Sequence, residues 1–298
     1  MSGIFAARVQ RRWADLDAQG HVNNTQLLDY LQEARTQLLL AEPALEGLAG
    51  ATRVASARVQ YLRPLRFSPE PLRVDVWLAD IGRDELVLDA VLWDGCAPAA
   101  RARTVLRLAA SWAPAASPAG LSRRRSLERF GVASAPAGFT PPASLPVAPL
   151  DGRGLAYDIA PRVSDTNVRH EIDEIRLYTY VQEARVAVMG RIDPAMARIG
   201  ATAGAASGPR PLLWLIAQQD IAYLAPVPYR PEPYRMRTAA VRLGTTSITI
   251  NAELTDPADP DTVLVRAATV SVAADGNGHP IPLPDHTRAV LQETMARR

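Results

Sequence analysis

The chain contains an internal repeat, and this repeat limits its fold more than any other feature of the sequence. Residues 15–35 (DLDAQGHVNNTQLLDYLQEAR) align without a gap on residues 165–185 (DTNVRHEIDEIRLYTYVQEAR), at a displacement of 150 residues. Later matches keep a displacement of 162: YLRP at 61–64 with YLAP at 223–226, and PEP at 69–71 with PEP at 231–233. The sequence therefore predicts two copies of one structural unit.

One segment rich in proline and small residues separates the two copies, and another interrupts the second copy. Residues 113–152 are rich in proline, alanine and serine and carry three consecutive arginines, which predicts a long connection with a short helix near 126–130. The change in displacement requires a 12-residue insertion, and the Gly/Ala/Ser-rich stretch at 199–208 predicts a loop there. We therefore expect a first domain at 1–112, a connection at 113–152, and a second domain with a C-terminal tail at 153–298.

Each copy reads as one helix followed by a set of strands. Apolar residues recur at helical spacing in both copies: Leu27, Leu28, Leu31, Ala34 and Leu38 in the first, and Leu177, Tyr178, Val181, Ala184 and Val188 in the second. Alternating apolar segments follow at 54–61, 72–79, 85–92 and 102–109, and again at 216–223, 234–241, 247–254 and 263–272, with turn signals at Gly82 and Gly244. This order predicts an α+β fold with two domains in tandem, each a central helix wrapped by an antiparallel sheet.

Composition excludes several classes of function. All 33 basic residues are arginine and the net charge is only +2, which argues against a nucleic-acid-binding protein and removes catalysis by a lysine Schiff base or a P-loop lysine. The single Cys96 cannot form an internal disulfide, and the four histidines show no metal-ligand spacing, so we expect no metal and no cofactor. No apolar run approaches the length of a membrane span, and we expect a soluble cytoplasmic protein.

One dense motif lies on the loop before the first helix. RWADLDAQGHVNN at 12–24, followed by EAR at 33–35, resembles the hotdog thioesterases of the 4-hydroxybenzoyl-CoA thioesterase type, which carry a D-x-D-x-x-G-H-V-N-N element at this place. The resemblance covers nearly all of both repeats. It implies two hotdog domains and hydrolysis of a thioester on coenzyme A (CoA) or acyl carrier protein, with Asp17 as the catalytic carboxylate. It also implies that tandem chains of this kind pair further, as a homodimer.

The same element resembles the aspartate-asparagine-histidine site of plant acyl-carrier-protein thioesterases, which are themselves tandem hotdogs. Asp17 and His21 match that site, whereas Gln19 stands where those enzymes have asparagine. Leu27 also departs from the pattern, because the family usually has an aromatic residue there. The helix side of the acyl pocket is therefore expected to differ.

Thioester hydrolysis needs a nucleophile or an activated water, together with donors for the developing oxyanion. Asp17 would attack the carbonyl or orient water, and His21 would hold the carboxylate or the water. Asn23, Asn24 and Thr25 would offer backbone amides at the helix N-terminus, where the dipole favours negative charge. Three arginines expected near the substrate, Arg58, Arg63 and Arg66, are candidates for binding phosphates.

Other readings of the same residues stay open. Aspartate and asparagine also shape turns and cap helices, and Asp15 recurs as Asp165, which favours a structural role for that pair. In the second copy Asn167 replaces Asp17, and because an amide is neither a carboxylate base nor a nucleophile, that site is expected to be degenerate. Glu171 is the remaining candidate for a rebuilt site there. The alternative function is a non-catalytic acyl-thioester binding or regulatory protein. A hotdog dehydratase is disfavoured because neither helix carries a histidine.

Overall fold

The computed structural model of the chain describes residues 3–17, 20–45, 47–108, 125, 127–128, 130–197 and 212–296. The insertion expected at 199–208 lies outside these residues, as do Ser126 and Arg129 of the helix expected near 126–130. The chain divides into two compact units, Met1–Ala143 and Ser144–Arg298. In the described residues, no helix combines the length and the apolar character needed to cross a membrane.

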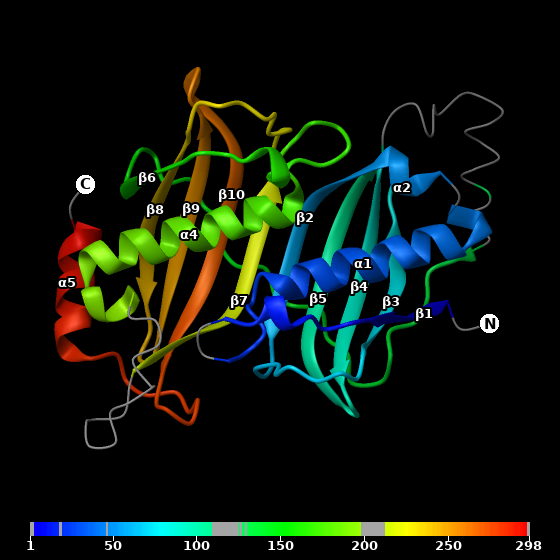
Figure 1. Cartoon of the computed structure of the whole chain (residues 1–298), viewed down its shortest axis with the longest axis horizontal. Coiled ribbons are helices and arrows are strands. Elements are labelled where there is room, and N and C mark those ends of the chain that lie inside the picture. Colours follow the sequence, from blue (N-terminus) through cyan, green and yellow to red (C-terminus); the bar gives the residue numbers. More distant parts are fainter. Residues whose placement is uncertain are drawn as a thin grey trace. The chain divides into compact units, whose positions relative to one another are not determined.

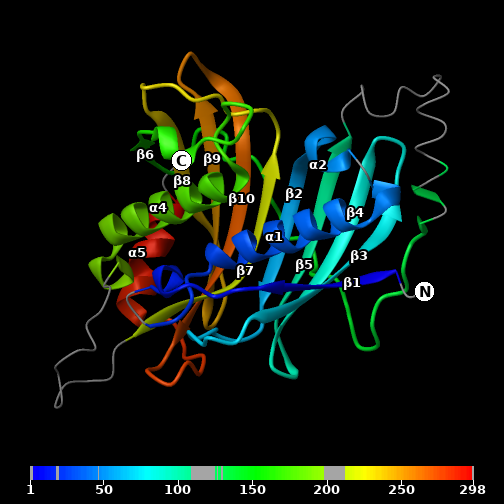
Figure 2. The ribbon, with the colours of Figure 1, turned by 45° about the vertical axis from the view of Figure 1, so that its right-hand side comes forward.

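In the first unit, one long helix lies across an antiparallel sheet (Figures 1 and 2). The strands follow the spatial order β1-β3-β4-β5-β2. Their bounds are β1 Ile4–Val9, β2 Thr52–Tyr61, β3 Leu72–Ile81, β4 Glu85–Asp94 and β5 Ala97–Leu108. The long helix is α1 Gln26–Ala41, and the short helical segments are η1 Trp13–Asp15, η2 Pro43–Leu45 and α2 Leu48–Ala51.

The second unit repeats this arrangement, with the strand order β7-β10-β9-β8-β6. Its strands are β6 Leu155–Ile159, β7 Leu213–Tyr223, β8 Tyr234–Leu243, β9 Ser247–Asp256 and β10 Asp259–Ala274. Helix α4 Glu174–Ile192 crosses the sheet, preceded by η3 Val163–Asp165 and followed by η4 Pro194–Ala197. A C-terminal helix, α5 Asp285–Ala296, packs its Leu291 into an apolar core shared with Val188 of α4 and Ile250 of β9.

The predicted helix faces are confirmed. All ten apolar positions named from the two helical patterns are buried. The eight predicted strands are also confirmed as β2 to β5 and β7 to β10, with ends that differ by a few residues. Gly82 and Gly244 begin hairpin turns, since their amides donate to the carbonyls of Glu85 and Ser247 at 2.8 and 2.7 Å. The two-copy α+β class predicted from the repeat therefore holds.

Besides the short helical segments η1 to η4 and α2, three elements were not predicted: the strands β1 and β6 and the helix α5. The two strands are short and lie at the outer edges of their sheets, beside β3 and β8. They also precede the repeated motif, where the two copies share no residue pattern that would mark them as equivalent. Pairing with a neighbouring strand, rather than local propensity, makes them strands.

The proline-rich connection covers the outer faces of the sheets. In the first unit the Phe139 ring contacts Trp77 of β3 edge to face, at a centroid distance of 4.7 Å. In the second unit the Leu145 amide donates to Asp220 of β7 at 2.9 Å, and Asn251 of β9 donates to the carbonyls of Pro146 and Ala148. Each helix therefore packs on one face of its sheet, while part of the connection packs on the other.

Candidate active site

Asp15 fixes both ends of the motif loop in the first unit. This carboxylate is only 5% exposed and accepts hydrogen bonds from the Arg12 amide at 2.7 Å and from the Tyr30 hydroxyl at 2.6 Å. Its backbone carbonyl accepts the Asn23 amide at 2.8 Å. Burial and the bond to Asp15 raise the pKa of Tyr30 well above its usual range, so the hydroxyl remains a donor.

Asp17 begins a tight turn that closes at His21. The Asp17 amide donates to the His21 carbonyl at 2.7 Å, and the His21 amide donates to Asp17 Oδ1 at 3.2 Å. Gly20 adopts a φ of +74° and donates its amide to the Asp17 carbonyl, a conformation that suits glycine. The turn thus holds the Asp17 carboxylate in place while leaving the side chain partly exposed. Gln19 lies outside the described residues.

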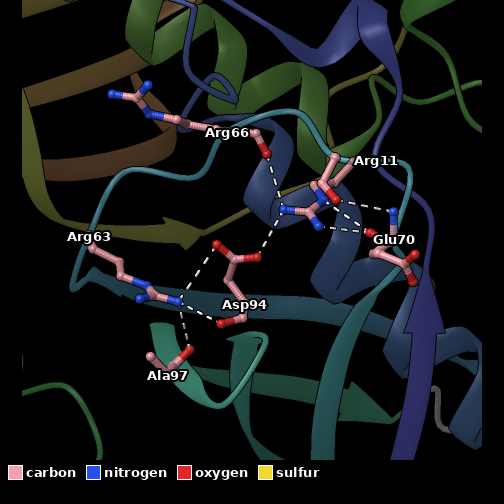
Figure 3. A network of polar contacts seen from close by, with 7 residues as sticks. Arg11, Arg63, Arg66, Glu70, Asp94 and Ala97 are labelled. Atoms are coloured by element: carbon pink, nitrogen blue, oxygen red, sulfur yellow. Dashed lines mark hydrogen bonds and ion pairs between the residues drawn. The ribbon is translucent and has the colours of Figure 1, made fainter.

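The turn is attached to the loop between β2 and β3. The Val22 amide donates to the Leu65 carbonyl at 2.8 Å, and His21 forms an antiparallel bridge with Arg66. Arg11 fixes this second loop, because its guanidinium donates to the carbonyls of Arg66 and Glu70. The guanidinium also donates to the Asp94 carboxylate at 3.0 Å (Figure 3). Arg11 is only 5% exposed, so a buried side chain fixes the position of the β2–β3 loop.

The N-terminus of α1 offers two unused donors, both on Asn24. Asn23 Oδ1 accepts from the amide and the hydroxyl of Thr25, each at 3.0 Å, while the Asn23 carbonyl accepts the Gln26 amide. Among the described residues, neither the Asn24 amide nor its buried Nδ2 has an acceptor. The Asn24 carbonyl, by contrast, accepts the Tyr61 hydroxyl at 3.0 Å. Asn23 therefore caps the first turn, and in the described part of the chain the two donors of Asn24 are left without an acceptor.

The three arginines named from the sequence occupy different places. Arg63 donates to the carbonyls of Asp94 and Ala97 at 2.7 and 3.2 Å and so holds the turn between β4 and β5 (Figure 3). Arg58 alternates with Tyr61 along β2, which puts its side chain on the sheet face away from α1. Only Arg66, whose backbone bridges His21, has an exposed side chain next to the motif loop.

The second unit keeps the loop architecture and changes the side chains. The Asp165 carboxylate accepts from the Arg162 amide and the Tyr180 hydroxyl at 2.9 and 2.7 Å, just as Asp15 does. Asn167 Oδ1 accepts the amides of Arg169 and Glu171, in the place of Asp17. The shared structural role predicted for Asp15 and Asp165 is therefore confirmed.

Two substitutions at the second loop have identifiable consequences. His170 takes the position of Gly20 with a φ of +57°, which is a rare conformation for a residue with a side chain. Asp173 takes the position of Asn23 and accepts the Ile175 amide at 2.9 Å, so this helix also has a capped start. The loop backbone is arranged alike in both units, and the carboxylate at the position of Asp17 is present only in the first.

Two residues that organise the first loop were not predicted from the sequence. In the sequence, nothing distinguishes Arg11 from an ordinary surface arginine, and Tyr30 falls among the apolar positions of the helix. The recurrence of Tyr30 as Tyr180, at the displacement of 150, was the available signal for a shared contact. Within the described residues, no group of three histidine, cysteine, aspartate or glutamate side chains is arranged to hold a metal ion.

Residues 11–113 match the family model described as the thioesterase-like superfamily. This match lies within the first unit and includes the whole motif loop. Among curated protein sequences, none matches the chain significantly.

Solved structures resemble the chain over nearly its whole length. An acyl-ACP thioesterase from Bacteroides thetaiotaomicron VPI-5482 matches with a TM-score of 0.62 and 10% identity, covering 90% of this chain and 98% of that one. A 12:0-ACP thioesterase from Umbellularia californica matches with a TM-score of 0.63 and 12% identity, covering 91% and 94%. The fold is thus that of the hotdog thioesterases, used twice in tandem, as the sequence predicted.

Proposed function

We propose that the chain hydrolyses an acyl thioester at the loop entering α1 and releases a free acid and a thiol. The substrate is an acyl group carried by coenzyme A or by an acyl carrier protein. The observation that carries this proposal is the pair of free donors on Asn24, next to the turn that holds the Asp17 carboxylate. The superfamily match over residues 11–113 supports the same activity.

In the proposed reaction, the thioester carbonyl oxygen accepts hydrogen bonds from the Asn24 amide and Nδ2. These donors are already oriented by the first turn of α1, and the helix dipole adds to their effect as negative charge develops on the oxygen. The Thr25 amide is bonded to Asn23 Oδ1, so we place the oxyanion role at Asn24 and give Asn23 and Thr25 the role of positioning it.

Asp17 supplies the carboxylate by one of two routes. It either attacks the carbonyl carbon to form a mixed anhydride that water then cleaves, or accepts a proton from a water molecule that attacks directly. In both routes the carbon–sulfur bond breaks, the thiolate takes up a proton, and the hydroxyl of water remains on the acyl carbon. His21 would hold the water or the carboxylate.

The second unit would contribute no turnover, because Asn167 lacks the carboxylate.

We also propose that two chains associate as a homodimer. Light scattering at working concentration should then give twice the 32.2 kDa mass of the chain, and a single 32.2 kDa species would contradict this.

Thiol release measured across short, long and aromatic acyl-CoA substrates, and from acylated carrier protein, tests the proposed activity. Release by the wild-type protein that is lost in Asp17→Asn, with unchanged thermal unfolding, supports it. No release above background from any of these substrates would instead favour a protein that binds acyl thioesters without hydrolysing them.

A further inference from the structure

Two aromatic side chains are exposed beside the motif loop. Trp13 of η1 is 74% exposed, and Phe67 of the β2–β3 loop is 42% exposed. Their ring centroids lie 5.6 Å apart at an interplanar angle of 79°. Such an edge contact holds the indole in place while leaving most of its surface accessible, which is the state of a ring that can stack on a planar ligand.

This aromatic pair lies directly next to the candidate active site. Phe67 follows Arg66, whose backbone forms the antiparallel bridge with His21. The Trp13 carbonyl accepts the Leu16 amide at 3.3 Å, so the indole belongs to the segment that leads into Asp17. A ligand stacked on Trp13 would therefore lie beside the Asp17 turn.

The surroundings of the pair carry positive charge. Arg66 turns its carbonyl toward Arg11, whereas its guanidinium projects away from that network (Figure 3). Among the described residues, this exposed guanidinium has no bonded partner. Arg12 is also exposed, and the acidic residues of the same two loops are the exposed Glu70 and the partly exposed Asp17. An anionic ligand that includes a flat ring fits this combination.

The equivalent surface of the second unit lacks the same features. Trp13 corresponds to Val163, Arg66 to Pro228 and Phe67 to Tyr229, at the displacements of the repeat. The bridge between Glu171 and Pro228 shows that the backbones are nevertheless arranged alike. The indole and the free guanidinium thus occur in the unit that also has the Asp17 carboxylate.

We propose that Trp13, Phe67 and Arg66 bind the adenosine 3′,5′-bisphosphate end of a coenzyme A thioester. The adenine stacks on the exposed indole, Phe67 supports the indole from its edge, and the Arg66 guanidinium binds phosphate oxygens. Two rings and one arginine are too small a surface for a carrier protein, since specific protein interfaces bury roughly 800 Å² on each partner. This inference rests on the proposed function, because it names the carrier of the acyl group.

Adenosine 3′,5′-bisphosphate itself is the probe for binding. Calorimetric titration should show saturable binding to the wild-type protein, and the affinity should fall about 10-fold in Trp13→Ala and in Arg66→Ala. The matched controls Val163→Ala and Tyr229→Ala in the second unit should bind as the wild type does. Asp17→Asn should also bind normally, so this measurement tests the subsite even if the protein hydrolyses nothing.

Kinetics on two thioesters of the same acyl group provide the second test. With acyl-CoA, Trp13→Ala should raise KM about 10-fold at unchanged kcat. With the acyl N-acetylcysteamine thioester, which lacks the nucleotide, neither constant should change. Wild-type protein that hydrolyses acyl-CoA but does not bind the bisphosphate would overturn the subsite alone. Equal losses on both thioesters, or a loss confined to acylated carrier protein, would also overturn it.

Discussion

The Tyr30 hydroxyl donates to Asp15 Oδ2 at 2.6 Å, in a contact where both side chains are buried. Because the Asp15 carbonyl also accepts the Asn23 amide, this bond connects the interior of α1 to the loop that presents Asn24. The same relationship recurs between Tyr180 and Asp165 at 2.7 Å. The two pairs allow stability and catalysis to be tested separately, since only the first pair supports a loop with a carboxylate at the position of Asp17.

Tyr30→Phe removes the donor and leaves a buried carboxylate with one bond fewer. We expect the free energy of unfolding to fall by about 1–3 kcal/mol, which denaturant titration measures. Because the loop then loses its anchor, kcat for the thioester should fall roughly 10-fold. Tyr180→Phe is the matched control and should lower stability similarly without changing kcat. Equal kcat losses in the two variants would contradict a positioning role for Tyr30.

Alkaline pH should destabilise the protein through the same tyrosines. The folded protein raises the pKa of Tyr30 and of Tyr180, whereas the unfolded chain ionises them near pH 10. Their contribution to stability is therefore complete below about pH 10 and is lost as the pH rises above it. Each should add about 1.4 kcal/mol per pH unit to the decline. The absence of lysine removes the main competing titration.

Tyr30→Phe should make that alkaline decline shallower by about 1.4 kcal/mol per pH unit. Unfolding free energies measured by denaturant titration between pH 8 and 11 test this. An unchanged slope would show that Tyr30 ionises alike in the folded and unfolded states.

Asp17→Asn retains the size of the side chain and an oxygen that can accept the His21 amide. Activity should fall by roughly 100-fold or more, because the reactive carboxylate is lost, while the melting temperature stays the same. Asn167→Ala, at the equivalent position, should cost little turnover. A fully active Asp17→Asn protein would remove the central assignment, and equal losses from both substitutions would point to a structural role of the two loops.

Asn24→Ala removes a buried donor that has no acceptor among the described residues. We expect thermal stability to be unchanged or higher, since an unpaired buried polar group is lost. If Nδ2 binds the oxyanion, kcat should fall by about 100-fold even though the Asn24 backbone amide remains. Glu174→Ala at the equivalent place serves as the control. Unchanged kcat in Asn24→Ala would leave the oxyanion role to the backbone amide alone.

Arg11→Met keeps much of the side-chain volume and removes the buried charge beside Asp94. The free energy of unfolding should fall by about 1–3 kcal/mol, because the loop carbonyls lose their donor, while the partly exposed Asp94 keeps Arg63 as a partner. Arg73→Met is the comparison, since Arg73 pairs with Asp75 at the surface and should contribute less than about 1 kcal/mol. Similar losses in both variants would show that the bonds of Arg11 to the β2–β3 loop do not stabilise the fold.

The sequence alone determined the two-copy organisation, the helix faces and the position of the motif. These features are local or periodic: Leu31 and Ala34 face the sheet because of helical spacing, and Gly82 marks a turn because glycine is a frequent turn residue. The DLDAQGHVNN motif identified the loop because its residues are adjacent in the chain. Asn167 likewise revealed, by its chemistry, that the second loop lacks the carboxylate.

Only the tertiary structure decided which groups at the site have partners. The Thr25 amide is occupied because Asn23 Oδ1 turns back to accept it, whereas the Asn24 donors have no acceptor among the described residues. Arg63 binds a turn more than thirty residues away, and Arg58 points to the sheet face away from α1. The sequence alone offered no reason to assign these two arginines different places. Hydrogen bonds between distant residues depend on how strands and loops meet in space, and residue types in one segment do not specify that meeting.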